Sequence, residues 1–526
     1  MSPRLDDAAG WLAAAHAHLT AALPGDGDEA ARLLCRHASE LRGAIDGVLA
    51  RPADAAGLRA VLLGFDVVRH LRLAIERPLA GDAAAEAGDA AEPPWAGALA
   101  RFYGCPELDR RLAIYAADVA AAATDVEAIR SAADVRAQLG AKGVFLDAAG
   151  RVALAAIDDV LATSTAALDA AIAARQPRDL FVALARAMVA ARRRRALVGS
   201  PPPLTGSERR AAARLFDDAR SALRASAPVA SPPSGPAVIR IEDALGAFAA
   251  AVASLDVTVA GVEPGAGRQL LRLRVGGVDA GDVHVVVGAG VARSHTIGHG
   301  GGVAVVWCNF DGGGGAAARL TLQDVYSLFH ELGHALQHAL LRSPYANLGG
   351  LAAVAPVRRE LASYLAEAWS REPGCRARLA AASDLGGEGR LAALDREAAA
   401  KTAALRAGVA RAVLVARCEL AIAELDEVTP ASLIQRVDAV TRTAGGDLGD
   451  FVDHADAGMV HGEGLVAYML GRLGGAQLAT ELAALAGAAP AAARDAYVRF
   501  LTDAGTVARL RATAWLERHP DGGSVS

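Results

Sequence analysis

The chain is organised around the stretch Phe329-His330-Glu331-Leu332-Gly333-His334-Ala335-Leu336-Gln337-His338, a His-Glu-x-x-His motif inside a helix-forming run. In a helix, His330 and His334 lie one turn apart on the same face and can bind one metal ion, with Glu331 beside them. Apolar residues at helical spacing predict a buried side for this helix: Val325, Leu328, Phe329, Leu332, Leu336 and Leu340. The alternative is a chance match in which the histidines make only structural hydrogen bonds.

A third ligand is expected downstream, because catalytic zinc sites usually take three protein ligands and leave the fourth position to water. The candidate is Glu360, within the segment 357–369. Glu367 follows seven residues later, two helical turns on, so both carboxylates face the same way. We expect Glu360 to bind the metal and Glu367 to orient a ligand. The alternative is a solvated acidic stripe paired with Arg358 and Arg359.

These motifs resemble those of the thimet oligopeptidase and mitochondrial intermediate peptidase family of zinc metallopeptidases. The resemblance rests on residues 329–336 and on a Glu-x-x-Ser-x-x-x-Glu-x-Trp segment at 360–369. The linking residues 341–345 are most similar to the intermediate-peptidase branch. Segments 305–310 and 322–325 are similar as well, and the resemblance extends weakly over about residues 100–510.

The resemblance implies that His330, His334 and Glu360 bind one Zn²⁺ per chain and that Glu331 is the general base. Glu367 matches the family's second acidic position. The chain departs from the family at 357–363, where an Asp-Phe-x-Glu-x-Pro-Ser pattern is usual. The shape of that segment therefore stays open.

The C-terminal region is a larger departure from the family, which places a histidine and several tyrosines after the zinc site. Within residues 454–472, Tyr468 matches a family tyrosine, whereas Leu465 and His461 stand where two others are expected. His454 reaches the family histidine only through a short insertion. We expect Tyr468 to stabilise the oxyanion. His454 and His461 are either substrate contacts or ordinary hydrogen-bonded histidines.

The composition predicts a mainly α-helical protein. Hydrophobic residues make up 53% of the 526 residues and aromatic residues only 4%, with abundant alanine. The resemblance implies a large helical body of two lobes flanking a deep channel. A proline-rich segment at 228–236 predicts an N-terminal helical lobe at 1–235 and a catalytic lobe at 236–526.

Three valine- or leucine-rich segments predict a small β-sheet next to the zinc helix: 269–275, 283–287 and 303–307. Its edge would let an extended peptide add as a further strand. The basic run at 192–195 is expected to be a solvated helix face rather than a site for acidic partners.

The net charge of −5 argues against nucleic acid as a partner. Five scattered cysteines suit free thiols in a reducing compartment, and we find neither a signal-peptide pattern nor a membrane-spanning run. The sequence therefore predicts a cytoplasmic protein that does not bind membranes, and it leaves open whether the protein is a monomer or a homodimer.

Together these expectations describe a zinc-dependent endopeptidase, or oligopeptidase, that hydrolyses short or unfolded peptides. Two alternatives remain open. One is a specialised peptidase for a single precursor or leader peptide. The other is a zinc-containing peptide-binding protein that has lost turnover, motivated by the missing tyrosines.

Overall fold

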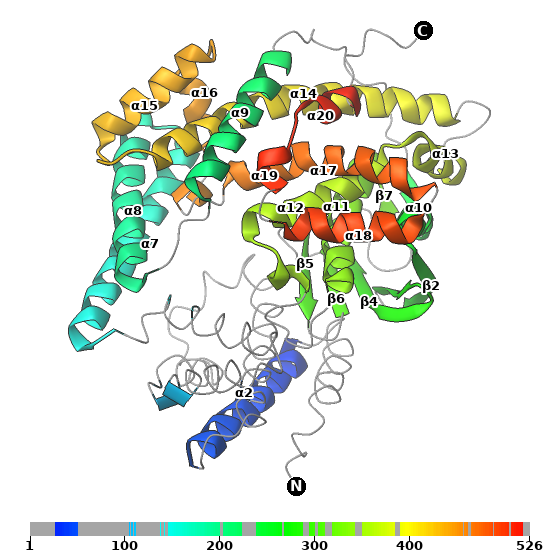
Figure 1. Cartoon of the computed structure of the whole chain (residues 1–526), viewed down its shortest axis with the longest axis horizontal. Helices are drawn as coiled ribbons and strands as arrows, with labels where there is room; N and C mark the ends of the chain where they lie inside the picture. The colour runs from blue at the N-terminus through cyan, green and yellow to red at the C-terminus, as the bar shows by residue number, and fades with distance from the viewer. Residues whose placement is uncertain are drawn as a thin grey trace. The chain divides into compact units, whose positions relative to one another are not determined.

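The structure is a computed structural model that is mainly α-helical with two small sheets (Figure 1), as the composition predicted. It describes residues 27–50, 61, 105, 107–108, 110–111, 137, 141, 146–199, 204–223, 238–265, 268–287, 294–299, 303–310, 318–341, 350–383, 390–455, 457–460, 464–487, 489–503 and 506–518. Within these ranges, no helix combines the length and the apolar character needed to cross a bilayer.

The chain divides into two compact units, each built from two separate segments. The first unit comprises Met1–Phe145 and Val238–Ala353, and the second comprises Leu146–Ala237 and Val354–Ser526. This division differs from the predicted consecutive lobes at 1–235 and 236–526. It shares only the boundary near residue 237, because the described helices between residues 146 and 223 pack with the C-terminal helices.

The first unit contains a five-stranded mixed sheet in the order β2-β3-β4-β6-β5. Only β4 and β6 pair in parallel, and the other neighbours are antiparallel. A further pair, β1 with β7, is antiparallel. The elements of this unit are α2 (Gly27–Ala50), β1 (Ile239–Arg240), α10 (Ile241–Val252), η3 (Ala253–Leu255), β2 (Val257–Gly265), β3 (Arg268–Val275), β4 (Val278–Val287), β5 (His295–His299), β6 (Val303–Cys308), β7 (Arg319–Leu320), α11 (Leu322–Leu340) and η6 (Gly350–Ala353).

The sheet matches the three predicted strands, which correspond to β3, β4 and β6. The turn between β3 and β4 requires glycine, because Gly276 and Gly277 have φ of +56° and +80°. The sequence analysis missed β2 and β5. Gly261 and Pro264 interrupt β2, and β5 has the sequence His-Thr-Ile-Gly-His, so both resemble loops by composition.

Helix α11 carries the His-Glu-x-x-His motif and packs against β4, β5 and β6. It begins with a capping box, in which the Thr321 hydroxyl accepts from the Asp324 N–H at 3.2 Å and Asp324 accepts from the Thr321 N–H at 2.8 Å. Phe329 packs edge-to-face on Phe248 of α10, with ring centroids 5.5 Å apart. Burial of its apolar side fixes the helix on the sheet.

The second unit is helical. Its elements are α7 (Ala148–Ala173), α8 (Pro177–Val198), α9 (Gly206–Leu223), α12 (Pro356–Ser370), α13 (Pro373–Ala382), α14 (Arg390–Ala423), α15 (Pro430–Thr443), α16 (Leu448–Val452), η7 (Ala457–Val460), α17 (Leu465–Ala486), α18 (Pro490–Thr502), α19 (Thr506–Arg509) and α20 (Thr513–Arg518). Helices α7 and α8 are separated at residue 175, where Arg175 has a φ of 51°, and Pro177 starts α8. Phe181 of α8 stacks on Phe451 of α16 within this unit's core.

Helices α12 and α17 lie side by side (Figure 1) and pack closely because of three glycines on α17. A Cβ on Gly475 would lie 2.6 Å from the Leu365 nitrogen and 2.7 Å from the Tyr364 carbonyl carbon. A Cβ on Gly471 would overlap Glu360, including its carbonyl carbon at 2.8 Å. The glycine pattern therefore sets the distance between the two helices.

Candidate metal centre

His330 and His334 lie on the same side of α11, as their spacing predicted. Their ring centroids are 5.2 Å apart, the ring planes are inclined at 85°, and both side chains are half-buried. His338, a further turn along, has a different role. Its Nδ1 accepts a hydrogen bond from the Leu351 N–H at 3.4 Å, and Gly350, at a φ of +58°, lies directly against the ring. His338 thus holds η6 on the helix.

Glu331 lies between the two histidines and is buried, with 8% of the residue exposed. The Thr296 hydroxyl lies 2.8 Å from Glu331 Oε2 and 2.8 Å from the Glu331 carbonyl oxygen, and it donates to them. Thr296 belongs to β5, at the edge of the sheet. The sequence analysis did not identify Thr296, because it lies on a strand that was not predicted. The contact fixes one of the two carboxylate oxygens, Oε2.

A buried cysteine of the sheet lies near Glu331. Cys308, at the end of β6, is fully buried. Burial raises the pKa of its thiol, and the nearby charges of Glu331 and Asp324 raise it further. Cys308 therefore stays a neutral thiol that packs behind the motif.

Glu360 lies on α12 in the second unit and is half-buried. The Ser363 hydroxyl donates to Glu360 Oε2 at 3.1 Å and to the Glu360 carbonyl oxygen at 2.9 Å. Ser363 is fully buried, one turn along the same helix. Ser363 and the close approach of Gly471 together restrict the position of Glu360. Ser363 stood within the segment quoted for the resemblance, but its contact with Glu360 was not predicted.

Glu367 is the centre of a charged cluster within the second unit. Arg371 Nη2 lies 2.9 Å from Glu367 Oε1, and Arg472 Nη1 lies 3.7 Å from the same oxygen. Arg472 also donates to the Tyr364 hydroxyl at 3.2 Å and stacks over that ring at 4.4 Å. Burial raises the pKa of Tyr364 to about 12, so it stays protonated. Glu367 is buried, so a solvated acidic stripe does not describe it.

The arginines that the alternative paired with these carboxylates have other contacts. Arg358 donates to the carbonyl oxygens of Thr502 at 3.1 Å and Asp503 at 2.6 Å. Arg359 donates to the Val354 carbonyl oxygen at 3.3 Å. Both guanidinium groups therefore bind backbone carbonyls within the second unit.

The three C-terminal candidates differ in their surroundings. Tyr468 lies on α17 with 44% of the residue exposed, one turn before Gly471 and on the side that packs against α12. His454 is half-buried, and its Nδ1 lies 3.1 Å from the Asp450 carbonyl oxygen. His461 lies outside the described residues. The structure therefore brings Tyr468 to the helix pair that carries Glu360.

Comparison with known proteins finds one family model that matches part of the chain. Residues 289–457 match peptidase family M3. The matched segment includes His330, Glu331, His334 and Glu360. No curated protein matches the sequence. The family match and the His-Glu-x-x-His helix support a metallopeptidase, a hydrolase that needs a divalent metal.

Three solved structures are similar over nearly the whole chain at low identity. Trypanosoma cruzi metallocarboxypeptidase 1 has a TM-score of 0.50 at 10% identity and covers 93% of this chain and 96% of its own. A carboxypeptidase from Pyrococcus furiosus has a TM-score of 0.49 at 12% identity, with coverages of 94% and 95%. The M32 carboxypeptidase from Deinococcus radiodurans R1 has a TM-score of 0.47 at 15% identity, with coverages of 95% and 96%. The first of these shows a similar fold.

Proposed function

We propose that the protein is a zinc-dependent peptidase in which His330, His334 and Glu360 bind the metal and Glu331 is the general base. The chemistry of the donor set supports this, because two imidazoles and one carboxylate suit Zn²⁺. Among the described residues, these three form the single group of His, Cys, Asp or Glu side chains that could hold a metal ion. Since Glu360 belongs to the second unit, its approach to the two histidines is part of the proposal.

The observation that carries the proposal is the burial and hydrogen bonding of Glu331. A buried carboxylate between two metal-binding histidines, with one oxygen held by Thr296, is arranged for proton transfer. When bound, the metal supplies a Lewis acid that polarises the scissile carbonyl and activates water. Glu331 Oε1 takes the proton from the attacking water and then delivers it to the leaving amine. Tyr468 donates to the developing oxyanion, and His454 or His461 contributes a substrate contact.

Substrate binding at the edge of the sheet follows from the position of β5. In the described part of the chain, β5 pairs on one side only, with β6, and it also contacts α11. Its other side can therefore accept the backbone of an extended peptide as an added strand. Backbone pairing is independent of side-chain identity, which suits short or unfolded peptides of many sequences.

We infer an endopeptidase, with a carboxypeptidase as the second candidate. The similar fold of a protein named as a metallocarboxypeptidase favours the second candidate. A dedicated precursor peptidase differs from both only in its range of substrates. A peptide-binding protein without turnover is less well supported, because Thr296 still holds Glu331 in place.

The test uses zinc-loaded protein and an internally quenched peptide made with either a free or an amidated C-terminus. An endopeptidase cleaves both forms, whereas a carboxypeptidase acts only on the free carboxylate. Glu331→Gln should keep its zinc and lose at least about 100-fold in kcat. Glu360→Ala should lose zinc affinity instead. Full activity in Glu331→Gln, or stoichiometric zinc in Glu360→Ala, would contradict the assigned roles.

A further inference from the structure

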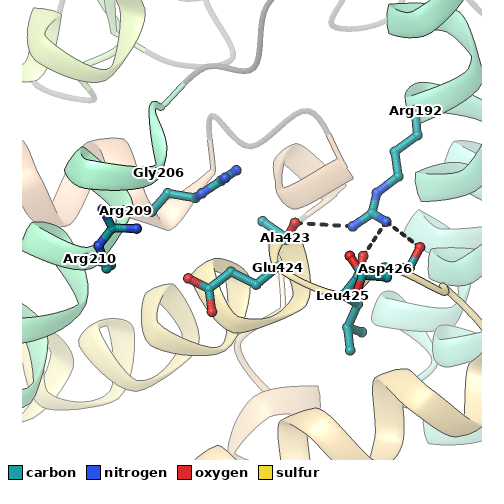
Figure 2. Close-up of a pocket in the computed structure, with 8 residues that line it drawn as sticks. All are labelled: Arg192, Gly206, Arg209, Arg210, Ala423, Glu424, Leu425 and Asp426. Carbon is teal, nitrogen blue, oxygen red and sulfur yellow. Dashed lines mark hydrogen bonds between the residues drawn. The ribbon is translucent and has the colours of Figure 1, made fainter.

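A cavity of about 500 Å³ lies within the second unit, and none of the residues proposed to bind metal lines it (Figure 2). It forms where α8, the start of α9 and the end of α14 converge. Its lining residues are Arg192, Gly206, Arg209, Arg210, Ala423, Glu424, Leu425 and Asp426. This volume is in the usual range of small-molecule sites.

Hydrogen bonds hold the Arg192 side chain in place on one side of this cavity. It donates to the carbonyl oxygens at the end of α14, including Ala423 at 3.2 Å, Asp426 at 3.4 Å and, at closer range, Leu425. A cation at a helix C-terminus is favourable. The solvated helix face expected for the run 192–195 is therefore wrong for Arg192. It is also wrong for Arg194, whose Nε lies 2.6 Å from Asp158 Oδ1.

Arg209 enters the cavity from α9, opposite Arg192 (Figure 2). Its Nε is buried and has no hydrogen-bond partner among the described residues. The neighbouring acid Glu208 does not serve Arg209, because its carboxylate accepts from the Thr205 N–H at 2.8 Å in the cap of α9. A buried guanidinium nitrogen without a partner is costly, and a ligand that accepts a hydrogen bond removes that cost.

The charge around the cavity favours an anion. Three arginines outnumber the two acidic lining residues, Glu424 and Asp426, which are both exposed. Burial lowers the pKa of Arg192, and the like charge of Arg209 lowers it further, against the opposite effect of Asp426. A negative group between the two guanidiniums relieves both their repulsion and the unmet hydrogen bond.

The geometry points to a binding site for a small oxyanion, a phosphate or carboxylate group held between Arg209 and Arg192 with Arg210 at the rim. Arg209 supplies the N–H···O bonds to either group, because both Nη atoms of Arg192 already donate to backbone carbonyls, so Arg192 contributes positive charge. The two sources of this chemistry are a phosphate-bearing metabolite and the free C-terminus of a peptide. A bound oxyanion would join the start of α9 to the end of α14.

The test is titration calorimetry of the full chain at constant ionic strength, with inorganic phosphate in one arm and acetyl-trialanine in the other. The amide of acetyl-trialanine serves as the uncharged reference. We expect saturable binding in at least one arm, and the arm identifies the source. Saturable binding in neither arm would overturn the proposal.

Variants then locate the site. Arg209→Ala should weaken binding at least tenfold, and Glu424→Gln should strengthen it by removing a competing negative charge. Arg214→Ala is the matched control, because Arg214 is exposed one turn further along α9 and does not line the cavity. If Arg214→Ala and Arg209→Ala lose the same affinity for the probe, the binding reflects general surface charge and the proposed site is overturned. Circular dichroism of each variant separates lost binding from lost folding.

Discussion

Gly471→Ala tests the link between helix packing and the proposed metal site. The added Cβ would lie 2.8 Å from the Glu360 carbonyl carbon and 2.9 Å from its oxygen, where ordinary contacts begin near 3.4 Å. The tightest overlap is with the Glu360 Cβ, so the backbone at Glu360 must recede by more than the roughly 0.6 Å that the carbonyl carbon alone requires. Metal sites hold their ligand distances within about 0.2 Å, so this shift should disturb the carboxylate.

The expected magnitude has two parts. Overpacking costs about 1–3 kcal/mol of unfolding free energy, and the higher helix propensity of alanine returns up to about 1 kcal/mol. Displacement of the proposed ligand should weaken zinc binding about 10–100-fold, the range found when a residue supporting a ligand is lost. The loss of zinc affinity should therefore be larger than the small decrease in unfolding free energy would cause by itself.

The assay is competition for zinc with a chelator. It compares the wild type and Gly471→Ala with two control variants at other glycines. Gly474→Ala, on the same helix, meets mainly the flexible ends of Leu361 and Leu510, so it should keep its zinc affinity. Gly408→Ala, in α14, meets nothing within 4 Å and should stabilise the fold by up to about 1 kcal/mol. The reasoning fails if Gly471→Ala is less stable yet binds zinc as tightly as the wild type.

Three further predictions concern Thr296, Tyr468 and two buried cysteines. Thr296→Val keeps the shape of the side chain but removes the donor to Glu331, so kcat should fall about tenfold with zinc content and KM unchanged. Thr296→Ser should restore kcat, and equal activity in Thr296→Val would exclude a positioning role. Tyr468→Phe should lower kcat without changing Tm, because the residue is 44% exposed; a change in KM alone would place Tyr468 in ground-state binding. Burial raises the pKa values of Cys375 and Cys418 to about 12, so both thiols should resist iodoacetamide at pH 8 until the protein is denatured, and rapid native alkylation would refute this burial.

The sequence predicted the helices and strands whose apolar residues form a clear local pattern. Helix α11 has a clear apolar side, and β3, β4 and β6 are rich in valine or leucine, so all four were predicted. Strand β5 was not predicted, because its glycine and two histidines give no strand pattern. It forms because β6 supplies its hydrogen bonds, a partner that local sequence does not reveal.

The same distinction applies to the candidate site. His330, Glu331 and His334 lie within one helical turn, so their spacing alone placed them together. Thr296 contacts Glu331 from 35 residues upstream, which no local pattern indicates. The pairing of Arg472 with Glu367 depends on the packing of α17 against α12.

One signal for that packing was present in the sequence. Gly471, Gly474 and Gly475 recur at three- and four-residue spacing along α17, which indicates a face in close contact with another helix. Segments of the two units alternate along the sequence for a different reason. Helices α7, α8 and α9 belong to the same unit as the distant C-terminal helices, and the proline-rich segment at 228–236 precedes only one of the boundaries between units.

The central claim is that Glu331 acts as the base of a zinc-dependent peptidase. It is tested most directly by mass-spectrometric analysis of a mixed library of unfolded peptides, digested by metal-analysed protein with Glu331→Gln alongside. The account predicts cleavage of many peptides at internal bonds by the wild type and none by the variant with bound zinc. No cleavage by the zinc-loaded wild type, or the same products from Glu331→Gln, would contradict it.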